Sequence, residues 1–136
     1  MKKIAFIGCG VMGTALATAA AQTIDPQQII VSDVATDKAK ALAQKLGCTA
    51  AADNHELVRE AEYIVFCVKP QFIKSVLLDL KDTMAQAVRQ DQKILVSIVA
   101  GVTRETYFEL LGLESGAVSF IRCLPNTACL IGKGIT

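Results

Sequence analysis

Three glycines near the amino terminus have the spacing of a phosphate-binding loop. Residues 8–13 read Gly8-Cys9-Gly10-Val11-Met12-Gly13, with an apolar run before them and an alanine-rich stretch after them. In a strand-loop-helix unit the first glycine permits a tight turn, the second lets backbone amides approach a pyrophosphate, and the third lets the helix pack on the strand. The positive end of the helix then faces the phosphates. The pattern therefore predicts a dinucleotide-binding loop.

Asp33 lies twenty positions after Gly13, at the end of the next apolar run. A carboxylate at this place accepts hydrogen bonds from the adenosine ribose and repels the extra phosphate of NADP, which favours NAD. The alternative is an aspartate that belongs only to a turn near a helix start, because Asp is common in such turns.

Two other polar segments follow strand-like runs. Lys69-Pro70 lies where a strand ends and a helix begins, and a lysine there is mildly unfavourable unless an anion or polar ligand offsets its charge. A solvated loop lysine explains it equally well. The fixed proline and two short polar side chains of Pro125-Asn126-Thr127 could orient a substrate or a nicotinamide ring. The alternative is that this segment only forms a turn. His55, the only histidine, has no partner that spacing identifies, and we assign it a surface position without a catalytic role.

Apolar runs alternate with helical patterns, and these elements must position the polar residues. Strands are predicted at 3–7, 29–31, 49–52, 63–68, 94–99 and 117–121, and helices at 12–22, 36–46, 53–61, from 70 onward and at 103–111. The buried face of the long helix from residue 70 is predicted to carry Phe72, Val76, Leu80 and Met84. This alternation predicts an α/β fold of the Rossmann type: a doubly wound, mostly parallel sheet with helices on both faces and ligands outside the carboxyl ends of the strands.

Composition restricts the class of protein. A chain of 136 residues has the size of one domain, so residues 1–136 are predicted to form a single dinucleotide-binding domain. With 52% hydrophobic and 20% charged residues and a net charge of +1, it has neither a basic stripe for nucleic acid nor a membrane-spanning run. We expect small-molecule partners, no nucleic acid and no membrane. The five cysteines are an odd number without a C-x-x-C pair, which indicates reduced thiols in a cytoplasmic protein and no metal site.

With these motifs in hand, the chain resembles the amino-terminal part of pyrroline-5-carboxylate reductase, the last enzyme of proline biosynthesis. The glycine-rich loop is shared with many dehydrogenases, but the ordered set of further motifs is more specific. Those motifs are Val68-Lys69-Pro70, Ser97-Ile98-Val99-Ala100-Gly101-Val102-Thr103 and Arg122-Cys123-Leu124-Pro125-Asn126-Thr127.

The resemblance implies a role for each motif. Residues 8–13 bind pyrophosphate, Asp33 lies at the ribose or 2′-phosphate position, and Asn54 reaches the adenosine side. The segments Val68-Lys69-Pro70 and Ala100-Gly101 line the nicotinamide end, and Asn126 and Thr127 lie near the substrate. The implied reaction is hydride transfer from NAD(P)H to the C=N carbon of 1-pyrroline-5-carboxylate, which gives L-proline.

The cofactor expected from the resemblance is NADPH. Members of the family generally use it, often with a serine, threonine or arginine near the end of the second strand. This chain has Ser32-Asp33-Val34 and no arginine there. We therefore expect NADPH with weakened discrimination against NADH.

Family members also continue with a helical domain that dimerises and supplies most of the substrate pocket. This chain stops shortly after Pro125-Asn126-Thr127. We expect a truncated chain without the carboxyl-terminal dimerisation domain, and a homo-oligomer once that domain is present. None of these residues is a convincing proton donor, so no catalytic residue is assigned, and the 136-residue chain is expected to bind cofactor without turnover.

Two alternatives remain open. Gly10-Val11-Met12-Gly13 is also similar to the loop of the 3-hydroxyisobutyrate and 6-phosphogluconate dehydrogenases, which oxidise β-hydroxy acids. A dinucleotide-sensing module without catalysis is the other alternative, because the fold does not fix the function.

Overall fold

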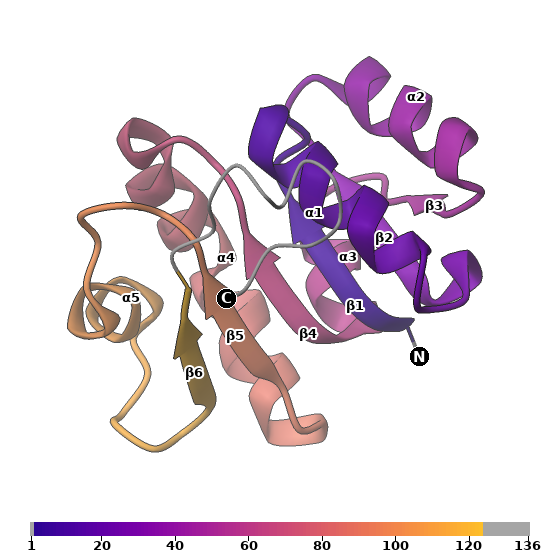
Figure 1. Ribbon diagram of the computed structural model, residues 1–136. Coiled ribbons are helices and arrows are strands. Elements are labelled where there is room, and N and C mark those ends of the chain that lie inside the picture. The colour runs from indigo at the N-terminus through magenta and orange to yellow at the C-terminus, as the bar shows by residue number, and fades with distance from the viewer. Residues whose placement is uncertain (1, 124–136) are drawn as a thin grey trace.

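Six parallel strands form one sheet in the computed structural model, which describes residues 2–123 (Figure 1). The elements in chain order are β1 (Lys2–Ile7), α1 (Val11–Ala21), the short 3-10 helix η1 (Pro26–Gln28), β2 (Ile29–Ser32), α2 (Thr36–Leu46), β3 (Thr49–Ala50), α3 (Asn54–Glu60), β4 (Ala61–Phe66), α4 (Pro70–Gln90), β5 (Ile94–Ser97), α5 (Arg104–Leu111) and β6 (Ser119–Arg122). The predicted fold class, a Rossmann-type α/β fold with a parallel sheet, is confirmed.

The strand order is β3-β2-β1-β4-β5-β6. The chain first winds outward from β1 to β3 and then returns to the other side of β1, so the winding direction reverses between β1 and β4. In open parallel sheets, ligands bind in the crevice at such a switch point, outside the carboxyl ends of the strands. The topology therefore places the ligand edge where β1 and β4 end.

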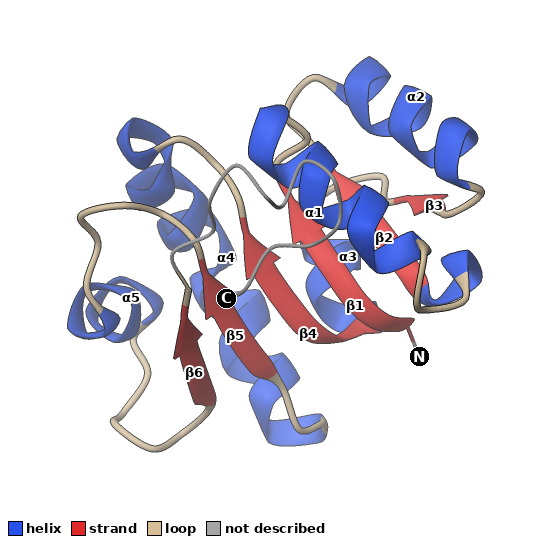
Figure 2. Ribbon diagram, viewed as in Figure 1, coloured by secondary structure: helices blue, strands red, loops and turns tan. Residues whose placement is uncertain are grey.

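Helices cover both faces of the sheet (Figure 2). Along β1 the side chains alternate: Ala5 and Ile7 join the core beneath α3, α4 and α5, whereas Phe6 joins the core beneath α1 and α2. All three are at most 3% exposed. Continuous apolar runs such as β1 are therefore explained by burial on both faces of the sheet.

Local signals set several helix ends. The Asp53 carboxylate accepts a hydrogen bond from the Glu56 amide at 2.8 Å, and the Glu56 carboxylate accepts one from the Ala52 amide at 2.7 Å. This closes the first turn of α3 much as a capping box does. Gly47 ends α2 in the left-handed conformation, with φ of +76°, which a glycine adopts without steric cost.

The predicted buried face of α4 was wrong at its start. Leu80 and Met84 are buried as predicted and Val76 is partly buried against the core, but Phe72 is 54% exposed. The buried face of α4 is completed by Ile73, Leu77 and Ala87. The predicted set advanced by four residues at each step, and a helix with 3.6 residues per turn rotates by about 40° beyond one turn at each such step. Alternate steps of four and three residues keep the same face, and these are the steps that the structure shows.

The boundary between α3 and β4 also differs from the prediction. The helix was expected to run through Ala61 and the strand to span 63–68, but β4 begins at Ala61 and ends at Phe66. Ala61 pairs with Lys2 in the sheet. The buried amine of Lys93 donates to the Ala61 carbonyl at 2.6 Å and to the Arg59 carbonyl at 3.4 Å, which satisfies the end of α3 from a distant segment. Burial lowers the pKa of this amine.

Smaller differences concern strand ends, since β3, β5 and β6 span 49–50, 94–97 and 119–122.

Among residues 2–123, Cys9, Cys48, Cys67 and Cys123 are free thiols, and Cys129 lies outside the described residues. None of the helices in this range combines the length and the apolar character that a membrane crossing needs. In the same range, His, Cys, Asp and Glu side chains form no group of three or more suited to a metal ion.

Candidate dinucleotide-binding edge

Five neighbouring strands, β2, β1, β4, β5 and β6, end in register at the carboxyl edge of the sheet. One backbone hydrogen bond joins each neighbouring pair at this edge. Register pairs Ile7 with both Ser32 and Phe66, and pairs Ser97 with Phe66 and Arg122. The linking bonds are Gly8 N to Ser32 O (2.8 Å), Cys67 N to Ile7 O (2.8 Å), Ile98 N to Phe66 O (3.3 Å) and Cys123 N to Ser97 O (2.8 Å). The loops that leave this edge therefore start from fixed positions.

Two glycines of the 8–13 loop are required by the packing of the loop itself. Gly8 has φ of +107°, and a Cβ on it would lie 2.9 Å from the carbonyl carbon of Cys67. A Cβ on Gly13 would lie 2.0 Å from the carbonyl oxygen of Gly8. The predicted tight turn at Gly8 and the predicted close packing of the helix at Gly13 are both confirmed.

Gly10 differs from the other two glycines. A Cβ on it would meet no atom within 4 Å, and its φ of −74° is open to any residue. Gly10 is the N-cap of α1, and the first hydrogen bond of the helix runs from Thr14 N to Gly10 O at 2.9 Å. The amides of Val11, Met12 and Gly13 precede that bond and have no intrahelical acceptor. Open space over unpaired amides at a helix start suits an anion.

The Asp33 carboxylate binds the backbone of the edge. Its Oδ2 accepts from the Cys9 amide at 2.6 Å and its Oδ1 from the Ala35 amide at 2.8 Å. The second bond is a turn contact, so the turn described by the alternative prediction is present. The first bond links the end of β2 to the glycine-rich loop, and sequence reasoning missed it because it joins residues 24 positions apart.

Replacing Asp33 with alanine is expected to lower the free energy of unfolding by about 2 kcal/mol, because two backbone amides lose a charged acceptor. Urea denaturation followed by circular dichroism measures this. Asp82→Ala, at an exposed position on α4, is the control and should change stability by less than about 0.5 kcal/mol. Equal effects of the two variants would contradict the anchoring role of Asp33.

The Cys9 thiol is a buried hydrogen-bond donor in the loop. It is 7% exposed and donates to the Ser32 carbonyl at 3.4 Å. Burial, followed by the nearby Asp33 charge, raises the pKa of the thiol from 9.0 to about 12. A thiol with such a pKa holds its proton at neutral pH.

This raised pKa predicts a loss of stability in alkaline solution. The contribution of Cys9 to the free energy of unfolding is fully present below pH 9, where the thiol of the unfolded chain is still protonated. It is lost as the pH rises toward 12, the pKa of the thiol in the folded chain. The urea midpoint should therefore fall more steeply between pH 9 and pH 11 in the wild type than in a Cys9→Ala variant. Parallel curves for the two proteins would contradict this assignment.

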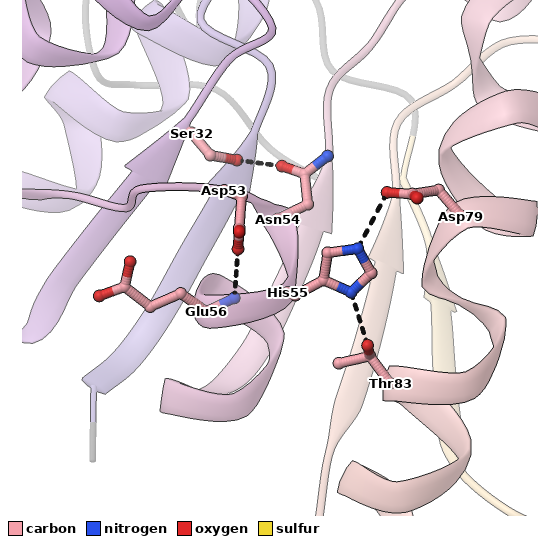
Figure 3. Close-up of polar contacts among 7 residues, drawn as sticks. All are labelled: Ser32, Asp53, Asn54, His55, Glu56, Asp79 and Thr83. Carbon is pink, nitrogen blue, oxygen red and sulfur yellow. Dashed lines mark hydrogen bonds and ion pairs between the residues drawn. The ribbon is translucent and has the colours of Figure 1, made fainter.

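Asn54 and His55 begin α3 and face different neighbours (Figure 3). The Asn54 amide oxygen lies 2.5 Å from the hydroxyl of Ser32, the last residue of β2. His55 was predicted to be a surface residue without an identifiable partner, but its ring is held by α4. Nδ1 lies 2.5 Å from Thr83 Oγ1, and Nε2 lies 3.1 Å from Asp79 Oδ2. No sequence signal finds these partners, because only the packing of α3 on α4 brings them together.

The loops after β4 and β5 lie beside each other at the same edge. Lys69 is exposed and is the N-cap of α4, and Pro70 is the first helical residue, as predicted. Val68 packs against the core beneath α4, whereas Ala100 and Gly101 are exposed. Asn126 and Thr127, predicted to lie near a substrate, are outside the described residues.

One hollow in the described part of the chain lies away from this edge. It measures about 410 Å³ and is lined by residues that include Arg89, Lys93 and Ser119. Lys93 and Ser119 precede or begin strands β5 and β6, so this hollow is at the amino ends of the strands. Ligands of doubly wound sheets bind at the opposite ends, and we therefore place the candidate site at the switch point.

Comparison with known proteins identifies the family. Residues 3–101 match the family described as NADP oxidoreductase coenzyme F420-dependent. The chain belongs to this family. The matched range includes the glycine-rich loop, Asp33, Asn54, the loop after β4 and Ala100-Gly101.

Within this family, the chain is similar to pyrroline-5-carboxylate reductases. That of Methanosarcina acetivorans is 39% identical over 134 residues, which cover 97% of this chain and 47% of the relative. A solved structure of the enzyme from Coxiella burnetii has 28% identity and a TM-score of 0.83, covering 98% of this chain and 47% of that one. The Plasmodium falciparum enzyme, solved with NADP bound, has 28% identity and a TM-score of 0.76, covering 98% and 45%.

These matches confirm the resemblance predicted from the motifs. The chain spans about half the length of the curated relatives that it matches.

Proposed function

We propose that this chain is the dinucleotide-binding half, residues 1–136, of an enzyme that reduces 1-pyrroline-5-carboxylate to L-proline with a nicotinamide cofactor. The observation that carries the proposal is the open space over Gly10 at the switch point, in a chain that matches reductases of this name along nearly its whole length. The relatives extend well beyond this chain, so the substrate and the activity belong to the complete protein.

The glycine-rich loop fits the pyrophosphate of the cofactor. Gly8 and Gly13 are fixed by contacts of the loop itself, but nothing in residues 2–123 fills the position of a Gly10 side chain. A pyrophosphate there accepts hydrogen bonds from the first amides of α1 and meets its positive end. Residues 8–13 are therefore the proposed pyrophosphate site.

The two ends of the cofactor follow from the order of the strands. The adenosine extends toward the end of β2, where Asp33 and Asn54 lie, and the nicotinamide extends toward β4 and β5. Val68, Lys69, Pro70, Ala100 and Gly101 are the proposed contacts at the nicotinamide end. Asn126 and Thr127 follow β6 and are proposed to lie near the substrate.

When bound, the reduced nicotinamide supplies a hydride, and the acceptor is the C=N carbon of the imine. The residues of this chain hold the cofactor in place at the sheet edge, which reduces the entropy cost of the transfer. We assign the proton donor to the part of the complete protein beyond this chain. The purified chain is therefore expected to bind cofactor without steady-state imine reduction, and turnover by the chain alone would overturn this division of roles.

We further propose NADPH as the preferred cofactor, with weak discrimination against NADH. Both oxygens of Asp33 accept backbone amides, which offsets part of the charge that would oppose a 2′-phosphate. The Asp33 carboxylate is still present, however, and no arginine follows it in the sequence. We therefore expect only a small preference for NADPH over NADH. Titration of the chain with each cofactor by calorimetry tests this, and NADH binding as tight as or tighter than NADPH binding would refute it.

The proposed activity is distinguished from its alternatives by substrate. The complete protein should reduce 1-pyrroline-5-carboxylate, and activity only on a β-hydroxy acid would favour the hydroxy acid dehydrogenases. Cofactor binding without turnover by the complete protein would favour a sensing role. We also propose that the complete protein is a homo-oligomer in the cytoplasm, and light scattering of the purified protein tests its assembly.

A further inference from the structure

The Ser32 hydroxyl is a buried donor that has one described partner. Ser32 is 3% exposed and ends β2, the strand that leads to Asp33. Its hydroxyl lies 2.5 Å from the Asn54 amide oxygen. A buried hydroxyl that does not donate a hydrogen bond costs free energy, and within residues 2–123 the side chain of Asn54 supplies the acceptor.

This contact fixes which way the Asn54 amide points. With the oxygen turned to Ser32, the amide nitrogen lies on the other side of the group, as Figure 3 shows. Its two N–H donors have no hydrogen-bond partner in the part of the chain that the structure describes. The opposite orientation would place an N–H group against the hydroxyl and leave the hydroxyl proton without its acceptor.

The backbone of Asn54 is held independently of this contact. Asp53 caps α3 through the Glu56 amide at 2.8 Å, and the His55 ring binds Asp79 and Thr83 of α4 (Figure 3). These contacts hold Asp53 and His55, the residues before and after Asn54, and so fix the first turn of α3. The remaining freedom of Asn54 is the rotation of its side chain, and Ser32 restricts that rotation.

We propose that Ser32 is a positioning residue, whose hydroxyl orients Asn54 so that its amide nitrogen donates to the 2′ position of the adenosine ribose. This inference rests on the proposed cofactor site, because the ribose lies at the end of β2 only if a dinucleotide binds there. A neutral N–H donor suits both a 2′-hydroxyl and a 2′-phosphate, and its hydrogen bond to the charged phosphate is the stronger of the two.

The test compares matched variants of the chain by calorimetry with NADPH, NADH, adenosine 2′,5′-bisphosphate and ADP. Ser32→Ala is expected to weaken the binding of NADPH and of the bisphosphate about tenfold, and the binding of NADH and of ADP about threefold. The difference is expected because a hydrogen bond to a charged phosphate is stronger than one to a hydroxyl. Ser32→Thr keeps the hydroxyl and should restore most of the affinity. Ser119→Ala, at an exposed position that begins β6, is the control and should bind as the wild type does.

A double variant separates positioning from a general effect on the fold. If Ser32 acts through Asn54, then Ser32→Ala added to Asn54→Ala should cause no further loss of affinity. Additive losses would overturn the proposal, as would wild-type affinity for the bisphosphate in Ser32→Ala. Failure of the wild type to bind any of the four ligands would instead refute the proposed cofactor site.

Nuclear magnetic resonance gives a readout that does not depend on the stability of a variant. The sequence holds two asparagines, Asn54 and Asn126, so labelling asparagine with ¹⁵N yields two side-chain amide pairs. Asn54→Asp removes one pair and thereby assigns it. Adenosine 2′,5′-bisphosphate should shift the Asn54 pair in the wild type, and saturating ligand that leaves it unmoved would overturn the proposal.

Discussion

Replacing Gly13 with alanine is expected to lower the free energy of unfolding by about 3 kcal/mol, with a fall in melting temperature of about 10 °C. The added Cβ would lie 2.0 Å from the Gly8 carbonyl oxygen, 3.0 Å from the Gly8 carbonyl carbon and 3.2 Å from the Cys67 Cβ. The first two of these atoms are backbone, so the start of α1 must move away from the loop. The higher helix propensity of alanine offsets only about 1 kcal/mol.

Urea denaturation and thermal melting measure this effect, and Gly10→Ala is its matched control. The same methyl group at Gly10 would meet no atom within 4 Å, so its stability should stay within about 1 kcal/mol of the wild type. A Gly13→Ala protein with the wild-type urea midpoint would show that α1 can shift on the sheet without cost. Equal losses of stability in Gly13→Ala and Gly10→Ala would contradict the inference that only the Gly13 position is crowded.

Replacing Gly10 with valine is expected to weaken NADPH binding at least about 100-fold while the chain stays folded. The branched side chain would occupy the open space over the start of α1, where the proposed pyrophosphate meets the amides of Val11 and Met12. Displaced phosphates lose both the hydrogen bonds and the favourable end of the helix dipole. Calorimetric titration measures the affinity, and circular dichroism confirms the fold.

Ala117→Val is the control for Gly10→Val, because it adds a branched side chain at an exposed position just before β6, away from the switch point. It should bind NADPH as the wild type does. Wild-type affinity in Gly10→Val would remove the pyrophosphate from this loop. A graded loss from Gly10→Ala to Gly10→Val would instead show that the size of the side chain limits the approach of the ligand.

Local patterns were sufficient for the strands, for most helix ends and for the position of the loop. Apolar runs bounded by glycine or polar residues indicate strands buried on both faces, as β1 and β4 are. Caps such as Asp53 and Thr103 act over three residues, so their pattern is visible in the sequence. The buried face of α4 was predicted only in part, because apolar residues occur on more than one side of the helix and Phe72 lies on the exposed side.

The candidate site was only partly predictable, because its contacts join segments distant in sequence. The motif indicated the roles of Gly8 and Gly13, but not that Asp33 would bind the Cys9 amide. The pairing of Ser32 with Asn54 spans 22 positions and that of His55 with Thr83 spans 28. Neither pairing follows from spacing, because both depend on how α3 packs between the end of β2 and α4.

Periodicity and motifs are local properties of the chain, and they were enough to predict the class of fold, the glycine-rich loop and the likeness to pyrroline-5-carboxylate reductases. The folded molecule was needed to show which glycine of the 8–13 loop is open to a ligand, where the Asp33 carboxylate points and which way the Asn54 amide faces. Those features depend on distances between elements, and these distances are set when the parallel strands align their carboxyl ends and the helices pack on both faces of the sheet.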